Sequence, residues 1–183
     1  MVKDYNLNTK KLINPDKSIS FYSKDDCLIR EETLGKSFTP IDEIPQHTKN
    51  AFISIEDKRF YEHNGIDYRG LLRATFNNLK SFSFKEGGST ISQQLIKNTH
   101  LTSEKTLKRK LIELKLTKEL ENEYSKDEIL EMYLNLIYFG NGAYGIQSAS
   151  KNYFGKDASD LTLAESATLA GLIKSPGRYS PHD

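Results

Sequence analysis

The sequence has one cysteine, almost no net charge and no long apolar run, and each shortage excludes a class of protein. Cys27 is alone among 183 residues, so no intramolecular disulfide can staple the fold. Charged residues make up 28% of the chain but sum to only +1, which favours neither nucleic acid nor an acidic tail. No segment reaches the roughly 18 apolar residues of a transmembrane helix, and no signal-peptide core is present. We expect any membrane anchor to lie outside this chain.

Several common catalytic and metal-binding motifs are missing as well. None of the four histidines has a nucleophile elbow nearby, so a Ser-His-Asp hydrolase is not supported. No Cys/His cluster has the spacing of a zinc site. The loop over residues 87–90 is not a P-loop, because no Gly-Lys-Ser/Thr ends it. The chemistry must therefore rest on carboxylates, amides and cations.

Apolar spacing predicts a mainly helical domain behind a short β-hairpin. Residues 1–18 are polar and aperiodic and predict a disordered tail or linker, which leaves residues 19–183 as one domain. Runs at 19–22 and 27–30 predict a hairpin that covers an edge of this domain. Helices are expected over about residues 45–57, 68–81, 91–98, 104–122, 126–135, 144–153 and 163–173.

Capping residues locate several helix starts. Ser125 and Thr162 each precede a glutamate by three residues and predict capping boxes. Asp67 and Ser103 are expected to cap the helices that follow them. Pro45 suits the first turn of its helix, where its missing N–H would be unsatisfied anyway.

The stretch from Phe52 to His63 holds a candidate base. An apolar helical run delivers Glu56 and Asp57 to the point where the helix pattern ends, and Gly65 follows. This arrangement presents a carboxylate at the lip of a cleft, or it is an ordinary helix that fades into a solvated loop. The burial expected for Phe52 and Ile55 fixes Glu56 beside the core.

Two further segments carry polar groups. The Gly-Gly-Ser-Thr loop feeds a helix with Lys97 on it, which makes its N-terminus a reasonable phosphate site. On the helix over 104–122, Arg109 and Lys110 can share one face with Glu113, whether as a binding site or as a surface salt-bridge ladder. The inner face of that helix is expected to be Leu107, Leu111, Leu114 and the neighbouring Ile112.

Carboxylates on a helical domain suggest sugar chemistry, and the cations suggest which kind. A glycosidase must protonate a poor leaving group and needs a carboxylic acid of raised pKa. Cations around a second carboxylate instead keep it ionised and suit a diphosphate leaving group. The pattern therefore favours glycosyl transfer from a lipid or nucleotide diphosphate, with one base for the accepting hydroxyl.

Four segments resemble, in order, the signature motifs of the bacterial peptidoglycan glycosyltransferases, glycosyltransferase family 51. This is the transglycosylase module of class A penicillin-binding proteins and of monofunctional transglycosylases. The likeness runs from about residue 40 to 181. Its motifs are EDKRFYEHNGID at 56–67, GSTISQQLIKN at 88–98, RKLIE at 109–113 and KDEILEMYLN at 126–135.

The resemblance implies a lysozyme-like helical lobe with a small membrane-facing jaw at about residues 68–105, in which Phe82 and Phe84 contact the membrane. It implies polymerisation of lipid II into a β-1,4 glycan with inversion. Glu56 would be the general base, and Glu113 would position or charge-balance the donor diphosphate, directly or through Mg²⁺ or another divalent cation. No organic cofactor is expected. By the same likeness the substrate-binding residues would be Asp57, Phe60, Ser89, Thr90, Gln93, Gln94, Lys97, Asn98, Arg109 and Lys110.

The expected setting is the extracytoplasmic face of a bacterial plasma membrane, with lipid II, the growing glycan strand and cell-wall synthesis proteins as partners and no nucleic acid. The family's N-terminal anchor and a later arginine motif beyond Pro181 are not in this sequence, so we expect a piece truncated at both ends. Two alternatives stay open: a lysozyme-like glycan hydrolase, and a module that binds lipid II without turning it over.

Overall fold

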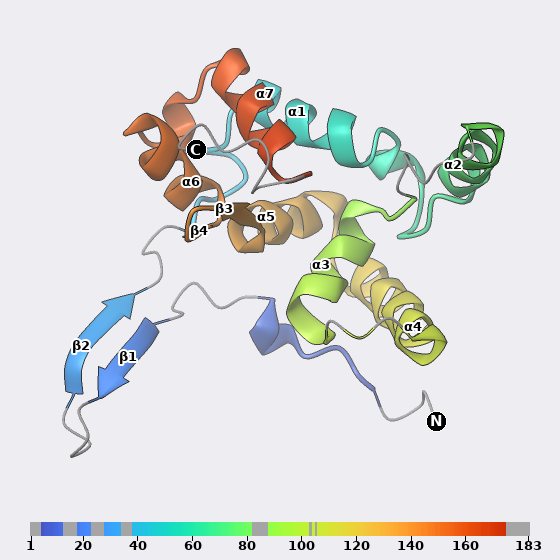
Figure 1. Ribbon diagram of the computed structural model, residues 1–183, viewed down its shortest axis with the longest axis horizontal. Helices are drawn as coiled ribbons and strands as arrows, with labels where there is room; N and C mark the ends of the chain where they lie inside the picture. The colour runs from blue at the N-terminus through green and yellow to red at the C-terminus, as the bar shows by residue number, and fades with distance from the viewer. Residues whose placement is uncertain are drawn as a thin grey trace.

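The computed structural model describes residues 5–12, 18–22, 28–33, 38–81, 88–102, 104 and 106–174 (Figure 1). The mainly helical fold class is confirmed. The α-helices of these residues are α1 (Gln46–Glu56), α2 (Tyr68–Ser81), α3 (Ile91–His100), α4 (Leu107–Glu123), α5 (Lys126–Leu136), α6 (Ile146–Phe154) and α7 (Leu163–Leu172). Short 3₁₀ turns lie at Thr9–Lys11, Phe60–Glu62 and Ala158–Asp160.

Two small antiparallel hairpins accompany the helices. The predicted N-terminal hairpin is present as β1 (Ser18–Tyr22) and β2 (Leu28–Thr33). It extends away from the helices in Figure 1, so the prediction that it covers an edge of the domain is wrong. The second hairpin, β3 (Tyr138–Gly140) and β4 (Ala143–Tyr144), turns at Asn141 and Gly142, which both have positive φ as the tightest hairpin turns require.

Helix α5 is the centre of the fold. Figure 1 shows it between the α1–α7 pair and α3, and α3 packs against both α4 and α5. Leu130, Tyr133 and Leu134 of α5 are fully buried, as their helical spacing predicts. Phe52 of α1 meets Phe139 edge to face, with 5.8 Å between ring centroids. This packing brings the C-terminal end of α1 over the first turns of α3.

Local capping chemistry explains where most helices begin. The capping boxes at Ser125 and Thr162 are confirmed, and the Asp67 carboxylate accepts the Gly70 amide as predicted. Helix α4 starts later than predicted, at Leu107, with Thr106 as its cap; Ser103 lies outside the described residues. Pro45 lies one position before α1 and not in its first turn.

The predicted inner face of α4 is confirmed for Ile112 but wrong for Leu107 and Leu111. Leu107 is 87% exposed and Leu111 is 57% exposed, whereas the buried face consists of Ile112, Glu113, Leu116, Thr117 and Leu120. The helix is rotated about its axis relative to the prediction, so that the Glu113 carboxylate lies against the core. The pattern of leucines cannot reveal this rotation, because it does not predict a buried carboxylate. The carboxylate is tolerated there because two cations accompany it.

Helix α2 keeps the predicted bounds but leaves most of its apolar side chains in solvent. Tyr68, Leu71, Leu72 and Phe76 are 48–72% exposed, whereas Ala74 is buried. Phe82 and Phe84, which we expect at a membrane, lie outside the described residues. None of the described helices is both long and apolar enough to cross a bilayer.

Part of the predicted N-terminal tail is ordered. Leu12 is 2% exposed, and the Leu7 amide donates to Glu119 of α4 at 3.1 Å. The Asn8 amide donates to His100 Nε2 at the end of α3, also at 3.1 Å. Disorder is therefore the wrong expectation for residues 5–12, because their backbone groups find partners on two helices.

Candidate active site

Glu56 is the last residue of α1 and is partly buried. Its Oε2 accepts a hydrogen bond of 2.7 Å from Gln94 Nε2 on α3, and the Tyr133 hydroxyl of α5 lies 3.5 Å from Gln94 Oε1. Burial, followed by the charges of Glu56 and Asp57, raises the pKa of Tyr133, so its hydroxyl remains a donor. Within the described residues Glu56 is thus held by one neutral amide, which leaves it able to accept a proton.

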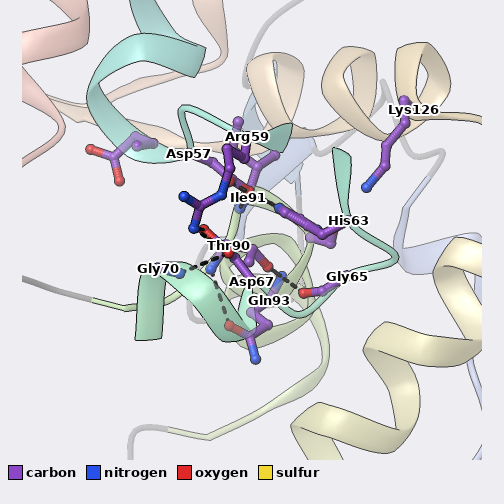
Figure 2. Close-up of polar contacts among 12 residues, drawn as sticks. Asp57, Arg59, His63, Gly65, Asp67, Gly70, Thr90, Ile91, Gln93 and Lys126 are labelled. Atoms are coloured by element: carbon purple, nitrogen blue, oxygen red, sulfur yellow. Dashed lines mark hydrogen bonds and ion pairs between the residues drawn. The ribbon is translucent and has the colours of Figure 1, made fainter. Parts of the chain in front are cut away.

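Asp57 follows Glu56 directly but is locked in place. It is 6% exposed, and its two oxygens lie 3.0 and 2.9 Å from His63 Nε2. Its Oδ2 also accepts the backbone amide of Ile91 at 3.1 Å. Figure 2 shows the three residues gathered beneath the end of α1. With these partners Asp57 supports the turn after α1.

The N-terminus of α3 already holds an anion, and that anion is Asp57. Thr90 and Gln93 form a capping box there: the Thr90 amide donates to Gln93 Oε1, and the Gln93 amide donates to Thr90 Oγ1. The Thr90 hydroxyl donates to the Gly65 carbonyl at 2.6 Å. The expectation of a phosphate at this N-terminus is therefore wrong, because the protein's own carboxylate satisfies the first amide and the helix dipole.

The turn after α1 is tightened by an ion pair and a glycine. Arg59 Nη2 contacts both oxygens of Asp67 at 2.5 and 2.6 Å (Figure 2). Burial opposes the charge of Asp67, but the hydrogen bonds from Arg59 and from the Gly70 amide lower its pKa. Gly65 has φ +84°, and a Cβ there would lie 2.7 Å from Thr117 Cγ2. Only glycine lets the turn approach α4 this closely.

Glu113 lies under two cations on α4. It is 2% exposed; Lys110 pairs with its Oε1, and Arg109 Nη1 lies 3.8 Å from its Oε2. The Lys110 side chain is 44% exposed. Among the described residues Arg109 Nε is buried without a partner. The buried carboxylate therefore orients a basic face that can receive an anion such as a diphosphate.

This donor set does not fit a metal ion held by the protein. Both oxygens of Glu113 are engaged by cations. The described part of the chain contains no cluster of three or more His, Cys, Asp or Glu side chains that could hold a metal.

A model of the transglycosylase family matches residues 27–183. The chain belongs to this family. It is 47% identical over 177 residues to penicillin-binding protein 1F of Bacillus subtilis, covering 97% of this chain and 25% of that protein. It is 50% identical over 184 residues to penicillin-binding protein 1A/1B of the same organism (99% and 20%) and 46% identical over 176 residues to penicillin-binding protein 1A of Neisseria lactamica (96% and 22%). The chain spans a quarter or less of these relatives' length. It carries a transglycosylase domain, which is a glycosyltransferase.

The transglycosylase domain brings some of the predicted site residues together and uses others elsewhere. Glu56 meets Gln94, and Arg109 and Lys110 meet Glu113. Ser89, Lys97 and Asn98 are exposed around α3. Phe60 is fully buried, with Lys126 Nζ 4.6 Å from its ring centre, so the expected substrate contact is wrong for this residue. Asp57, Thr90 and Gln93 hold the backbone as described above.

Sequence reasoning missed the supporting residues of the transglycosylase domain. His63, Gly65 and Tyr133 were not predicted to act together with the site. One signal exists for Gly65, since a glycine that follows a helix end indicates a backbone with positive φ. His63 and Tyr133 give no comparable signal, because their contacts join segments that are distant in the chain.

Proposed function

We propose that this transglycosylase domain polymerises lipid II into peptidoglycan glycan strands. A hydroxyl of the acceptor sugar forms a bond to the anomeric carbon of the donor, and the bond from that carbon to the lipid diphosphate breaks. The electron pair leaves with the diphosphate, and the hydroxyl proton passes to Glu56. Attack from the face opposite the diphosphate gives inversion and a β-1,4 linkage.

The observation that carries this proposal is the environment of Glu56. Its hydrogen bond from Gln94 fixes the carboxylate without neutralising it, as a general base requires. Asp57, the only adjacent acid, is occupied by His63 and the Ile91 amide. Glu56 is therefore the carboxylate in this region that we assign to the acceptor hydroxyl.

Arg109 and Lys110 are proposed to stabilise the departing diphosphate, with Lys97 on the neighbouring helix. Glu113 orients the first two and balances their charge before the substrate arrives. A divalent cation enters this proposal only as a companion of the diphosphate, bound through phosphate oxygens, because Glu113 is already engaged. A chelator should then lower the rate without changing the melting temperature of the protein.

Helix α2 is proposed to rest on the extracytoplasmic surface of the membrane, where the lipid-linked substrate resides. The exposed Leu71, Leu72 and Phe76 support this placement, since apolar side chains of this size gain free energy by leaving water. Arg69 and Arg73 lie on the same helix and suit an anionic surface.

The test is lipid II polymerisation by wild type and by Glu56→Gln. General base catalysis contributes about 10²- to 10⁴-fold, so we expect a rate loss of that order with an unchanged melting temperature. Glu43→Gln, at an exposed position before α1, is the matched control and should retain full rate.

Other outcomes separate the alternatives. Polymerisation at the full rate by Glu56→Gln would contradict the assignment of Glu56 as the general base. Soluble fragments released from purified cell walls would favour the glycan hydrolase. Binding of lipid II without any product would favour the non-catalytic module.

A further inference from the structure

A cavity of about 840 Å³ lies between the turn after α1 and the outer side of α4. Glu56, Gln94, Arg109, Lys110 and Glu113 are not among the residues that line it, so it is distinct from the candidate active site. We call it the turn–α4 cavity. The turn contributes Asn64 and Ile66 to its wall, α2 contributes Arg69, and α4 contributes Leu114, Lys118 and Asn122.

Most charges around the turn–α4 cavity are already paired. Arg59 binds Asp67, as Figure 2 shows, and Lys115 lies 3.3 Å from Glu119. Glu121 accepts from Lys126 at 2.8 Å. Two exposed cations of the lining, Arg69 and Lys118, have no ion pair or hydrogen bond to any described residue.

These two cations come from different elements, and the carboxylate of Glu62 in the same lining acts on the charge of Arg59. The amide side chains of Asn64 and Asn122 also line the cavity and can donate hydrogen bonds. Arginine and lysine together with amide donors match the oxygens of a phosphate group. The partly buried Ile66 and Leu114 provide apolar contact beside them.

The position of the cavity indicates where such a phosphate comes from. Tyr68 and Arg69, the first two residues of α2, line the cavity, and the exposed Leu71, Leu72 and Phe76 follow on the same helix. Figure 1 shows α2 and α4 at the same end of the molecule. A phosphate at the bilayer surface could therefore enter the cavity while these apolar residues contact the acyl region.

We propose that the turn–α4 cavity binds the phosphate of an anionic phospholipid headgroup, with Arg69 and Lys118 as its principal ligands. The inference rests on the membrane contact of α2 under the proposed function. The lipid assigned to this cavity is a bilayer lipid and not the substrate. Its binding would fix the orientation of the domain on the membrane.

The test is flotation with phosphatidylcholine vesicles, with and without phosphatidylglycerol. Wild type should bind the phosphatidylglycerol vesicles more tightly, and the double variant Arg69→Gln/Lys118→Gln should lose about tenfold or more of that gain. The matched control is Arg73→Gln/Lys108→Gln, which removes the same charge from the same two helices outside the cavity and should cost only the smaller, general attraction of a cation to the anionic surface. Equal losses in both pairs would overturn the site in favour of unspecific attraction.

A second arm distinguishes a lipid headgroup from free phosphate. Glycerol 3-phosphate in solution should perturb the NMR signals of Asn64 and Asn122 only weakly and at high concentration, because the apolar contacts are missing. Tight binding of soluble glycerol 3-phosphate, without any gain from phosphatidylglycerol vesicles, would overturn the lipid assignment.

A third arm keeps the inference separate from the proposed function. In detergent without anionic lipid, Arg69→Gln/Lys118→Gln should polymerise lipid II at the wild-type rate and melt at the wild-type temperature. A raised KM for lipid II would place the two cations in the substrate site and overturn the headgroup proposal. If wild type itself forms no glycan, the proposed function fails while the vesicle comparison still decides this inference.

Discussion

The turn after α1, called the supporting turn, and the reactive face formed by Glu56, Arg109 and Lys110 are both polar. In the supporting turn the acidic side chains, Asp57 and Asp67, are paired across the chain, although among the described residues the buried Nδ1 of His63 has no partner. On the reactive face, Glu56 has one neutral partner, and the Arg109 and Lys110 side chains are 20% and 44% exposed. We therefore expect changes in the supporting turn to lower stability and changes on the reactive face to lower activity.

The largest effect on this comparison is expected from Asp57→Ala. The change removes the acceptor of the Ile91 amide and of His63, both of which are then buried without a partner. Each orphaned group costs about 1–3 kcal/mol, so for the two groups we expect a loss of about 2–6 kcal/mol in the free energy of unfolding. Urea denaturation measures it.

The control for Asp57→Ala is Asp160→Ala, at an exposed position before α7, which should change the free energy of unfolding by less than about 0.5 kcal/mol. If Asp57→Ala abolished polymerisation but kept full stability, Asp57 would belong to the reactive face. The division between a supporting turn and a reactive face would then be wrong.

A smaller effect is expected from Gln94→Ala on the reactive face. The variant frees the Glu56 carboxylate from its only described hydrogen bond and lets it rotate away from the acceptor. We expect a loss of about tenfold in kcat, the equivalent of one modest positioning interaction, with the melting temperature within about 2 °C of wild type. Steady-state kinetics with lipid II decide it. A collapse in stability at unchanged kcat would assign Gln94 to the supporting turn.

The smallest effect concerns His100, outside both regions. Burial lowers its pKa, with a smaller opposing contribution from Asn8 and a further lowering from Lys11. The unfolded chain therefore binds more protons, so this contribution to stability is present above about pH 6.5 and is lost as the pH falls through the folded pKa.

We expect His100→Gln to flatten the pH dependence of the melting temperature slightly between about pH 7.5 and pH 5.5; the effect should be small because the side chain is partly exposed. Thermal melting across that range checks it. A steeper dependence in the variant than in wild type would contradict the assigned sign.

The parts of the fold that sequence predicts well are those set by neighbouring residues. Ser125 and Thr162 cap helices with glutamates three positions away, so their motifs are complete within four residues. The buried positions of α5 follow from spacing alone. The resemblance in the four motifs also led to the family that the comparisons show.

The wrong predictions concern positions whose contacts come from segments distant in the sequence. The sequence predicts an open anion-binding site at the N-terminus of α3. In the structure the Ile91 amide there donates to Asp57, which lies 34 residues earlier in the chain. The leucines of α4 indicate one inner face, but the cations around Glu113 allow another. Burial of a charged side chain is decided by tertiary partners, which composition and periodicity do not contain.

The bond between Asp57 and the Ile91 amide has a mechanical consequence. It ties together the two ends of the segment that contains α2, and those same ends carry Glu56 and lead to Gln94. Under the proposed membrane contact, we expect tilting of α2 to be taken up between Asp57 and Ile91. The distance between the Glu56 carboxylate and Gln94 should then stay constant while α2 moves, which would keep the proposed base in place during catalysis.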